Sequence, residues 1–309
     1  MQVITEEQVH RCLSFKTLIE SLKLGFSMPA GTPPRHVYEL DSKTHDAFAV
    51  LPAWNEQYIA VKAFTYFPNN AEQGYQSLYS KLMLFKRDFG EPLALIDGSS
   101  VTLWRTAAVS ALASQYLSRT DARHLVFFGS GNLAEYMIKA HISVRPIEKV
   151  TIIARNTKKA EQLCSCLSTQ YKDVEFFLGV SDEQTLASAD IVSCATGSAT
   201  PLFDGAWLSP GTHIDLIGNH HKNARECDSA TITRSAVFVD SKVNVLNEAG
   251  ELLIPISEGE FDARNVVAQL SEMNQLNYVR DKEQITLFKS VGMALSDLLS
   301  AGLVYRLNC

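Results

Sequence analysis

The chain has 309 residues, of which 46% are hydrophobic and 20% charged, so it has a globular composition and is long enough for two domains. Its net charge of −6 and the lack of a Lys/Arg block exclude nucleic acid and anionic membranes as main partners. The sequence has no apolar run of membrane-spanning length and no secretory signal pattern at residues 1–10, so we expect a cytoplasmic protein. Its six cysteines lack the spacing of a metal site, so we expect reduced thiols and no bound metal.

The first part of the chain predicts helices on either side of a β-rich segment. A capping box at Thr5–Gln8 opens the first helix, and apolar residues with helical spacing continue from Leu18 to Phe26. The next expected elements are a strand at 58–67, a hairpin of 82–85 and 93–96 around Asp88–Gly90, and a helix that follows Asp97–Ser100 and runs to about Leu117.

From about Asp121 the pattern changes to short apolar runs, the early ones separated by helical segments. Repeated strand–helix units of this kind predict a parallel sheet, and therefore an α/β fold. The expected strands are 125–128, 150–154, 174–178, 191–194, 214–217 and 237–239. A last helix is expected from the spacing of Phe288, Val291, Leu295, Leu298 and Leu299.

The loop after the first of these strands reads Gly129-Ser130-Gly131-Asn132-Leu133-Ala134. A G-x-G-x-x-A sequence between a strand and a helix is typical of the phosphate-binding turn of a Rossmann domain. Gly129 is expected to make the tight turn, Gly131 to let the backbone approach a pyrophosphate, and Ala134 to let the helix pack closely. Backbone N–H groups and the helix dipole would hold the phosphates, so the sequence predicts a dinucleotide site.

The end of the second strand indicates which dinucleotide is used. It reads Ala154-Arg155-Asn156-Thr157 and lacks the carboxylate that would bind a ribose 2′-hydroxyl and repel a 2′-phosphate. Arg155 can pair with that phosphate, and Asn156 and Thr157 can donate hydrogen bonds, which favours NADPH. If Arg155 stacks on adenine instead, NADH is usable as well. Thr196, after the strand at 191–194, either contacts the cofactor or forms a simple turn.

Several motifs outside the glycine loop are more specific than the loop itself. They are Pro34-Arg35, Val61-Lys62, Leu103–Ala108, Asp215–Gly218 and Phe288–Gly292. With these motifs the chain resembles the ornithine cyclodeaminase/mu-crystallin family over nearly its whole length. The resemblance implies a homodimer and places Gly218 at the cofactor. It also implies a Rossmann-type NAD(P)-binding domain at 120–286 and an α+β substrate-binding and dimerisation domain at 1–119 and 287–309.

The resemblance assigns the α-carboxylate of a substrate to Arg35, Lys62 and Arg105. Two guanidinium groups and an ammonium group at one point require an anion, and Arg suits carboxylates because it binds them through two hydrogen bonds. Lys62 lies in an apolar strand, where a charge is costly unless it is paired. The alternatives are that Arg35 and Arg105 are surface charges and that Lys62 extends its ammonium group to solvent.

Two departures from the cyclodeaminase pattern concern proton transfer. Cyclodeaminases carry a Glu three residues before the proline matching Pro52 and an Asp two residues after the glycine matching Gly218, whereas this chain has Ala49 and His220. Expelling ammonia and closing a ring requires such acids, but reducing a preformed cyclic imine requires only a cofactor hydride and one proton. Lys62 and His220 are therefore the candidate catalytic residues, with a structural or cofactor-contacting role for His220 as the alternative.

The C-terminal half is similar to the Δ1-pyrroline-2-carboxylate reductase branch through motifs at 214–218, 224–226, 248–255 and 285–290. This similarity implies an NAD(P)H-dependent oxidoreductase of CH–NH bonds that makes L-proline and, from the six-membered imine, L-pipecolate. The sequence leaves ring size, strictness of cofactor choice and pathway open. Alternative activities are those of an ornithine cyclodeaminase or an alanine dehydrogenase. The non-enzymatic alternative is an NADPH-binding protein such as mu-crystallin.

Overall fold

The computed structural model describes residues 1–276 and 278–309. It divides into two compact units, which are Met1–Val109 with Met293–Cys309 (unit 1) and Ser110–Gly292 (unit 2). The boundaries expected from the sequence, 119/120 and 286/287, lie near these divisions but at other residues. The first differs because helix α3 (Gly98–Leu117) is continuous through residue 109, and the second because strand β14 (Ile285–Lys289) belongs to the sheet of unit 2.

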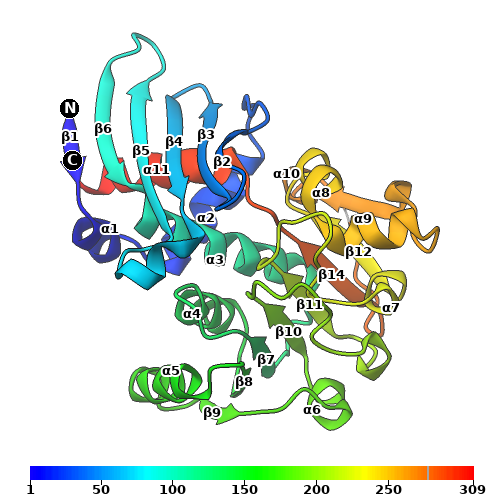
Figure 1. Ribbon diagram of the computed structural model, residues 1–309. Coiled ribbons are helices and arrows are strands. Elements are labelled where there is room, and N and C mark those ends of the chain that lie inside the picture. The colour runs from blue at the N-terminus through cyan, green and yellow to red at the C-terminus, as the bar shows by residue number, and fades with distance from the viewer. Residues whose placement is uncertain (277) are drawn as a thin grey trace. The chain divides into compact units, whose positions relative to one another are not determined.

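Unit 1 is built on a six-stranded sheet in the order β1-β6-β5-β4-β3-β2 (Figure 1). Neighbouring strands from β2 to β6 are antiparallel, and β1 joins β6 in parallel. The predicted hairpin is confirmed, with Gly90 at φ +66° between β5 and β6. The strands are β1 (Gln2–Ile4), β2 (His36–Asp41), β3 (Asp46–Trp54), β4 (Tyr58–Tyr66), β5 (Leu78–Lys86) and β6 (Pro92–Asp97).

Helices α1 (Glu6–Cys12), α2 (Phe15–Phe26) and α11 (Ala294–Leu307) complete unit 1 with the start of α3. The capping box that opens α1 is confirmed, because the Thr5 side chain accepts from the backbone of Gln8 and the Gln8 side chain accepts from that of Thr5. Helix α11 packs against α2 and against β3, β4 and β5. The two chain ends lie together beside β1 (Figure 1), where the Gln2 side chain donates to the Asn308 carbonyl.

The predicted last helix is wrong in its first part. Phe288 lies in strand β14, and α11 begins only at Ala294. Every residue of β14 is buried, and periodicity alone does not distinguish such a short apolar run from a buried helical segment. Gly292, with φ +82°, separates the strand from the helix.

Unit 2 contains an eight-stranded, entirely parallel sheet in the order β13-β12-β14-β11-β10-β7-β8-β9. The chain proceeds outward from β7 through β8 to β9 and then returns to β10 on the other side of β7. This reversal is the crevice-forming point of a Rossmann domain, so the predicted fold class is confirmed. The other strands are β7 (His124–Phe128), β8 (Lys149–Ile153), β9 (Glu175–Leu178), β10 (Ile191–Cys194), β11 (His213–Leu216), β12 (Ser235–Val239) and β13 (Val266–Gln269).

Seven α-helices connect these strands in the described part of unit 2. They are α4 (Ala134–Val144), α5 (Thr157–Gln170), α6 (Glu183–Ala187), α7 (Ser229–Thr233), α8 (Lys242–Glu248), α9 (Gly250–Ser257) and α10 (Leu270–Met273). Short 3-10 helices cover Pro68–Gln73 in unit 1 and Gly205–Trp207 and Ala263–Asn265 in unit 2. The core of unit 2 includes fully buried Val126, Val192 and Ile214, which lie on three adjacent strands.

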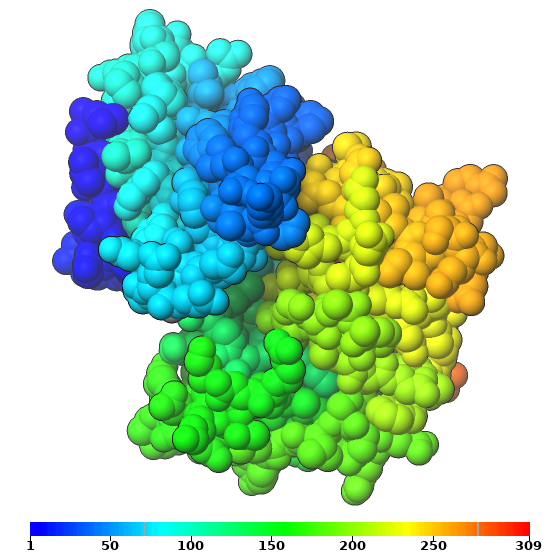
Figure 2. Space-filling model, in the orientation of Figure 1, coloured from blue at the N-terminus to red at the C-terminus, as the bar shows by residue number. Residues whose placement is uncertain are grey.

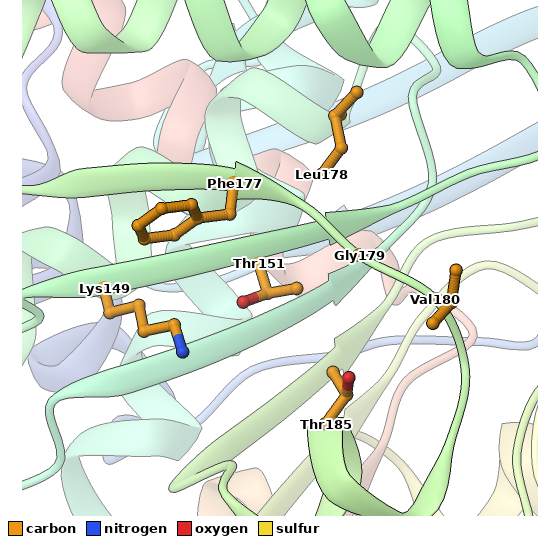
Figure 3. A pocket seen from close by; sticks show the side chains of 7 residues that line it. All are labelled: Lys149, Thr151, Phe177, Leu178, Gly179, Val180 and Thr185. Carbon is orange, nitrogen blue, oxygen red and sulfur yellow. The ribbon is translucent and has the colours of Figure 1, made fainter.

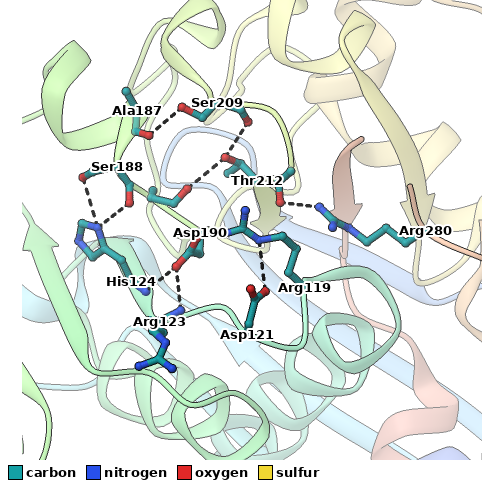
Figure 4. A network of polar contacts seen from close by, with 12 residues as sticks. Arg119, Asp121, Arg123, His124, Ala187, Ser188, Asp190, Ser209, Thr212 and Arg280 are labelled. Carbon is teal, nitrogen blue, oxygen red and sulfur yellow. Dashed lines mark hydrogen bonds and ion pairs between the residues drawn. The ribbon is translucent and has the colours of Figure 1, made fainter. Parts of the chain in front are cut away.

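The amino-terminal ends of β7 and β10 are tied together by Asp190 (Figure 4). Its carboxylate accepts the backbone N–H groups of Arg123 at 2.7 Å and His124 at 2.9 Å, and it forms an ion pair with Arg119. The His124 ring is held at the same end, with Nδ1 2.9 Å from the Ser188 carbonyl. These contacts lie at the opposite strand ends from the glycine loop, so they stabilise the sheet without occupying its ligand edge.

Candidate active site

Two buried cations in unit 1 share one buried carboxylate. Lys62 is on β4 between Leu51 and Leu82 of the adjacent strands, and it is 4% exposed. Its Nζ lies 2.8 Å from Oδ2 of Asp297 on α11, and Nε of Arg105 on α3 donates to Oδ1 of the same Asp at 3.0 Å. Lys62 therefore does not extend to solvent, and Arg105, at 8% exposure, is not a surface charge.

Asp297 neutralises only part of this positive charge. Burial lowers the pKa of Lys62 to about 8; Asp297 opposes that shift, while Arg105 and Arg35 add to it. Burial alone would raise the pKa of Asp297, but Arg105 and Lys62 outweigh burial and hold it below its ordinary value. Arg35, half-buried before β2, is thus within electrostatic reach of Lys62. Lys62 and Arg105 share this single carboxylate, which leaves capacity for a second anion.

Asp297 was missed by the sequence reasoning, although the sequence contains a signal for it. It is the only charged residue between Ala294 and Tyr305, in a segment otherwise made of apolar and small residues. A lone charge on a buried helix requires a partner. The partner itself was not predictable, because 192 residues separate Arg105 from Asp297.

The glycine loop of unit 2 has the shape that a pyrophosphate requires. Gly129 adopts φ +131°, and a Cβ there would lie 2.8 Å from the Ala195 carbonyl oxygen. A Cβ on Gly131 would meet nothing within 4 Å, so this side of the loop is open to a ligand. Helix α4 then begins at Ala134, and Leu133 provides no side-chain cap for its first turn. Uncapped N–H groups at such a helix start suit an anion, so the loop from Gly129 through Ser130 and Asn132 fits a dinucleotide.

The segment after β8 is exposed except for half-buried Ala154. Asn156 is the N-cap of α5, and its side-chain oxygen accepts from the Lys159 backbone at 3.0 Å. Its amide oxygen is thus committed to the helix, which leaves the NH2 group for a ligand. Arg155 and Thr157 are both exposed, so the end of this strand presents donors and no carboxylate.

The residues after β10 and β11 are joined by Glu226. Its carboxylate accepts the backbone N–H and the hydroxyl of Thr196, so this hydroxyl proton is engaged within the protein. It also accepts the backbone N–H of Gly218. His220 is exposed and its ring stacks on that of His221, with centroids 4.8 Å apart. At the other departure from the cyclodeaminase pattern, Ala49 is fully buried on β3.

An open groove lies elsewhere in unit 2 (Figure 3). It has a volume of about 500 Å³ and borders the sheet edge at β8 and β9. Its lining residues are Lys149, Thr151, Phe177, Leu178, Gly179, Val180 and Thr185. None of them is a predicted site residue, and the open groove brings together only one ionisable side chain.

Residues 1–276 and 278–309 contain no group of three or more His, Cys, Asp or Glu side chains placed to hold a metal ion, and none of their helices is long and apolar enough to cross a membrane. All six cysteines are free thiols.

Comparison with known proteins agrees with this arrangement. The model of the ornithine cyclodeaminase/mu-crystallin family matches residues 2–307. A protein of Colwellia psychrerythraea named Δ1-pyrroline-2-carboxylate reductase is 54% identical, with 97% of each chain covered. The structure of Thermococcus litoralis Δ1-pyrroline-2-carboxylate reductase in complex with NADH and L-proline has a TM-score of 0.94 at 32% identity, covering 99% of this chain and 97% of that one. An archaeal alanine dehydrogenase dimer with bound NAD has the same fold, with a TM-score of 0.92 at 24% identity over 99% and 95% of the two chains.

Proposed function

Because the chain belongs to the ornithine cyclodeaminase/mu-crystallin family, we propose that it reduces the C=N bond of Δ1-pyrroline-2-carboxylate to give L-proline, using a nicotinamide dinucleotide. The observation that carries this proposal is 54% identity, over 97% of both chains, to a protein named for this reaction. The protein is therefore an oxidoreductase acting on CH–NH bonds. Reduction of the six-membered imine to L-pipecolate is a second activity that the same site would support.

The cations of unit 1 bind the substrate carboxylate in this proposal. Arg105 and Lys62 are held by Asp297, so their side chains are ordered before the substrate arrives. Arg35 adds the third positive charge and is less buried than Lys62 and Arg105. An anion that binds here gains charge-assisted hydrogen bonds in a largely water-free setting, and it is oriented by them.

Reduction then requires a hydride and a proton. A reduced nicotinamide, when bound to unit 2, supplies the hydride. Lys62 and Arg105 fix the carboxylate, and through it the adjacent imine carbon. His220 is the proposed donor of the proton to the imine nitrogen, because its ring is exposed, an imidazolium can donate a proton, and it sits where cyclodeaminases carry an acid.

Two residues argue against the cyclodeaminase activity. Ala49 is fully buried on β3, and it cannot move a proton where a cyclodeaminase uses a Glu. His220 replaces the second acid of that pattern. The intact set of Arg35, Lys62 and Arg105 favours catalysis over a purely binding role such as that of mu-crystallin.

A substrate panel tests the proposed function. Purified protein is assayed by cofactor absorbance with Δ1-pyrroline-2-carboxylate, Δ1-piperideine-2-carboxylate, ornithine, and alanine with NAD. We expect rapid cofactor oxidation with the cyclic imines only. Formation of proline from ornithine would contradict the assignment, and so would binding of NADH or NADPH without reduction of either imine.

Arg155 is proposed to contact the 2′-phosphate of NADPH, which would make NADPH the preferred cofactor. Replacing Arg155 with alanine should weaken NADPH binding by about tenfold or more, because a charge-assisted contact is lost, and leave NADH binding nearly unchanged. Titration of cofactor fluorescence measures both affinities. Lys172→Ala, which removes a positive charge beyond the far end of α5, is the matched control. Equal weakening of both cofactors would remove Arg155 from the phosphate site.

The pH dependence of substrate binding is expected to follow Lys62. Its pKa is about 8, and the protonated form binds a carboxylate, so kcat/KM should fall as the pH rises through about 8. In Lys62→Arg the side chain stays charged, so this fall should disappear even if the absolute rate is lower. Measuring both proteins side by side separates the titration of Lys62 from that of the imine. Identical profiles would show that Lys62 does not control binding.

Two further properties are proposed for the protein as a whole. A homodimer formed through unit 1 is supported by β2, an edge strand whose side chains are all exposed (Figure 2, blue). Exposed Val37, Tyr38 and Leu40 give that edge an apolar character suited to a second copy. A cytoplasmic location is supported by the six free thiols, which persist in a reducing compartment.

A further inference from the structure

The Glu226 carboxylate is fully buried and connects two loops at the carboxyl edge of the unit 2 sheet. Oε1 accepts the Thr196 backbone N–H at 2.7 Å and the Thr196 hydroxyl at 2.8 Å. Oε2 accepts the Gly218 backbone N–H at 2.8 Å. A Cβ on Gly218 would lie 2.1 Å from the Thr196 nitrogen and 2.6 Å from Glu226 Oε1, so the three residues are in direct contact. One side chain thus sets the separation of the segments that follow β10 and β11.

A second set of buried polar contacts holds the segment after β11. Lys289, at the end of β14, lies with Nζ 3.0 Å from Glu251 Oε1 and donates to the Asn219 carbonyl at 2.6 Å. The Asn219 side chain donates to the Ser198 carbonyl at 2.6 Å. Glu251 also accepts the backbone N–H of Glu226. The residue before His220 is therefore anchored on both its main chain and its side chain.

We propose that Glu226 is a positioning residue that fixes Thr196 and the Gly218–His220 segment against the nicotinamide end of the cofactor. This inference rests on the proposed function for the identity of the cofactor. Its basis in the structure is that, among the described residues, the Glu226 carboxylate accepts hydrogen bonds from Thr196 and Gly218, at the ends of β10 and β11, and from no residue of the glycine loop or of the segment after β8. These two strands lie on the opposite side of β7 from β8 and β9. The second half of a dinucleotide binds on this β10–β11 side of the switch point. The adenine and phosphate contacts should therefore not depend on Glu226.

The replacement Glu226→Gln tests the acceptor role with almost no change of shape. Glu226 accepts on both oxygens, whereas a glutamine amide has one oxygen and one NH2 group. Whichever way the amide points, its NH2 group faces a backbone N–H, either of Gly218 or of Thr196. One loop must then move away. Asp228→Asn is the matched control, because Asp228 likewise accepts one distant backbone N–H, from Gly205, and both the N–H and the hydroxyl of a threonine, Thr231.

The readout compares NADH with ADP-ribose, which differ only by the nicotinamide. We expect Glu226→Gln to weaken NADH binding by about tenfold while ADP-ribose binding, measured by calorimetry, stays within about twofold. The fluorescence of bound NADH should shift, and kcat should fall by about 10²-fold because the reacting carbon is misplaced. Asp228→Asn should change neither the ratio of the two affinities nor kcat. NADPH and 2′-phospho-ADP-ribose form the parallel pair.

Three results would overturn the inference. They are equal weakening of NADH and ADP-ribose, the same changes in Asp228→Asn, or wild-type values in Glu226→Gln. If Glu226→Gln does not fold, Thr196→Val is measured instead, because it removes one donor from the same carboxylate. This variant must also weaken the binding of NADH more than the binding of ADP-ribose. The affinity ratio needs no substrate. A wild-type protein that binds NADH but reduces no imine would therefore refute the proposed function while leaving the ratio as a test of Glu226.

Discussion

Replacing Arg105 with alanine is expected to lower kcat/KM for Δ1-pyrroline-2-carboxylate by about two orders of magnitude, with a raised KM. Arg105 is 8% exposed, and its guanidinium group is held through Nε by Asp297, which leaves the terminal NH groups to bind a carboxylate in a fixed orientation. In the alanine variant the substrate carboxylate would be left with Lys62 and Arg35. The adjacent imine carbon would lose its orientation as well as part of its binding energy.

Two comparisons make the Arg105 experiment specific. Lys81→Ala removes another cation of unit 1 that is paired with an Asp, but Lys81 is exposed and its partner is Asp97, so activity should not change. Free guanidinium ion, added to Arg105→Ala, should restore part of the rate by occupying the vacated space. An unchanged KM and kcat/KM in Arg105→Ala would remove this residue from the substrate site.

The parts of the fold that were predictable are those encoded over short stretches of sequence. The capping box at Thr5, the hairpin turn ending at Gly90 and the buried run of β7 each depend on neighbouring residues, and each is found in the structure. The glycine loop was also predictable, because its function requires a strand before it and a helix after it. The switch in strand order at β7 then follows from the Rossmann pattern.

The errors and omissions have a common physical origin in tertiary context. The run at Phe288 suits a helix or a strand, and only its place between β11 and β12 makes it a strand. The sequence indicated that Lys62 needs an anion, and the structure shows that Asp297 already supplies one. The role of Glu226 likewise depends on Thr196 and Gly218, which only the fold brings to its carboxylate. A polar residue's chemistry is visible in the sequence, but its partner is set by the fold.

Asp297 provides the second large expected effect, which concerns stability. Asp297→Asn keeps the size of the side chain and removes its charge, so Lys62 and Arg105 lose their shared counter-ion inside unit 1. Removing one member of a buried ion pair costs about 3–5 kcal/mol. We expect a loss of this size in the free energy of unfolding at pH 7, measured by urea denaturation.

The loss caused by Asp297→Asn should be smaller at pH 9 than at pH 7. Lys62, with a pKa of about 8, is largely charged at the lower pH and largely neutral at the higher one, so at pH 9 Asp297 interacts mainly with Arg105. In the variant the pKa of Lys62 should fall further, and the alkaline fall of kcat/KM should move to lower pH with it.

Asp240→Asn is the matched control, because Asp240 is an equally buried carboxylate that binds neutral donors, the Ser290 hydroxyl and the backbone N–H groups of Val291 and Gly292. The effect of Asp240→Asn on the free energy of unfolding should be the same at both pH values. If the effect of Asp297→Asn were also independent of pH, the charge of Lys62 would not be coupled to Asp297, and the ammonium group would have to be stabilised by another group.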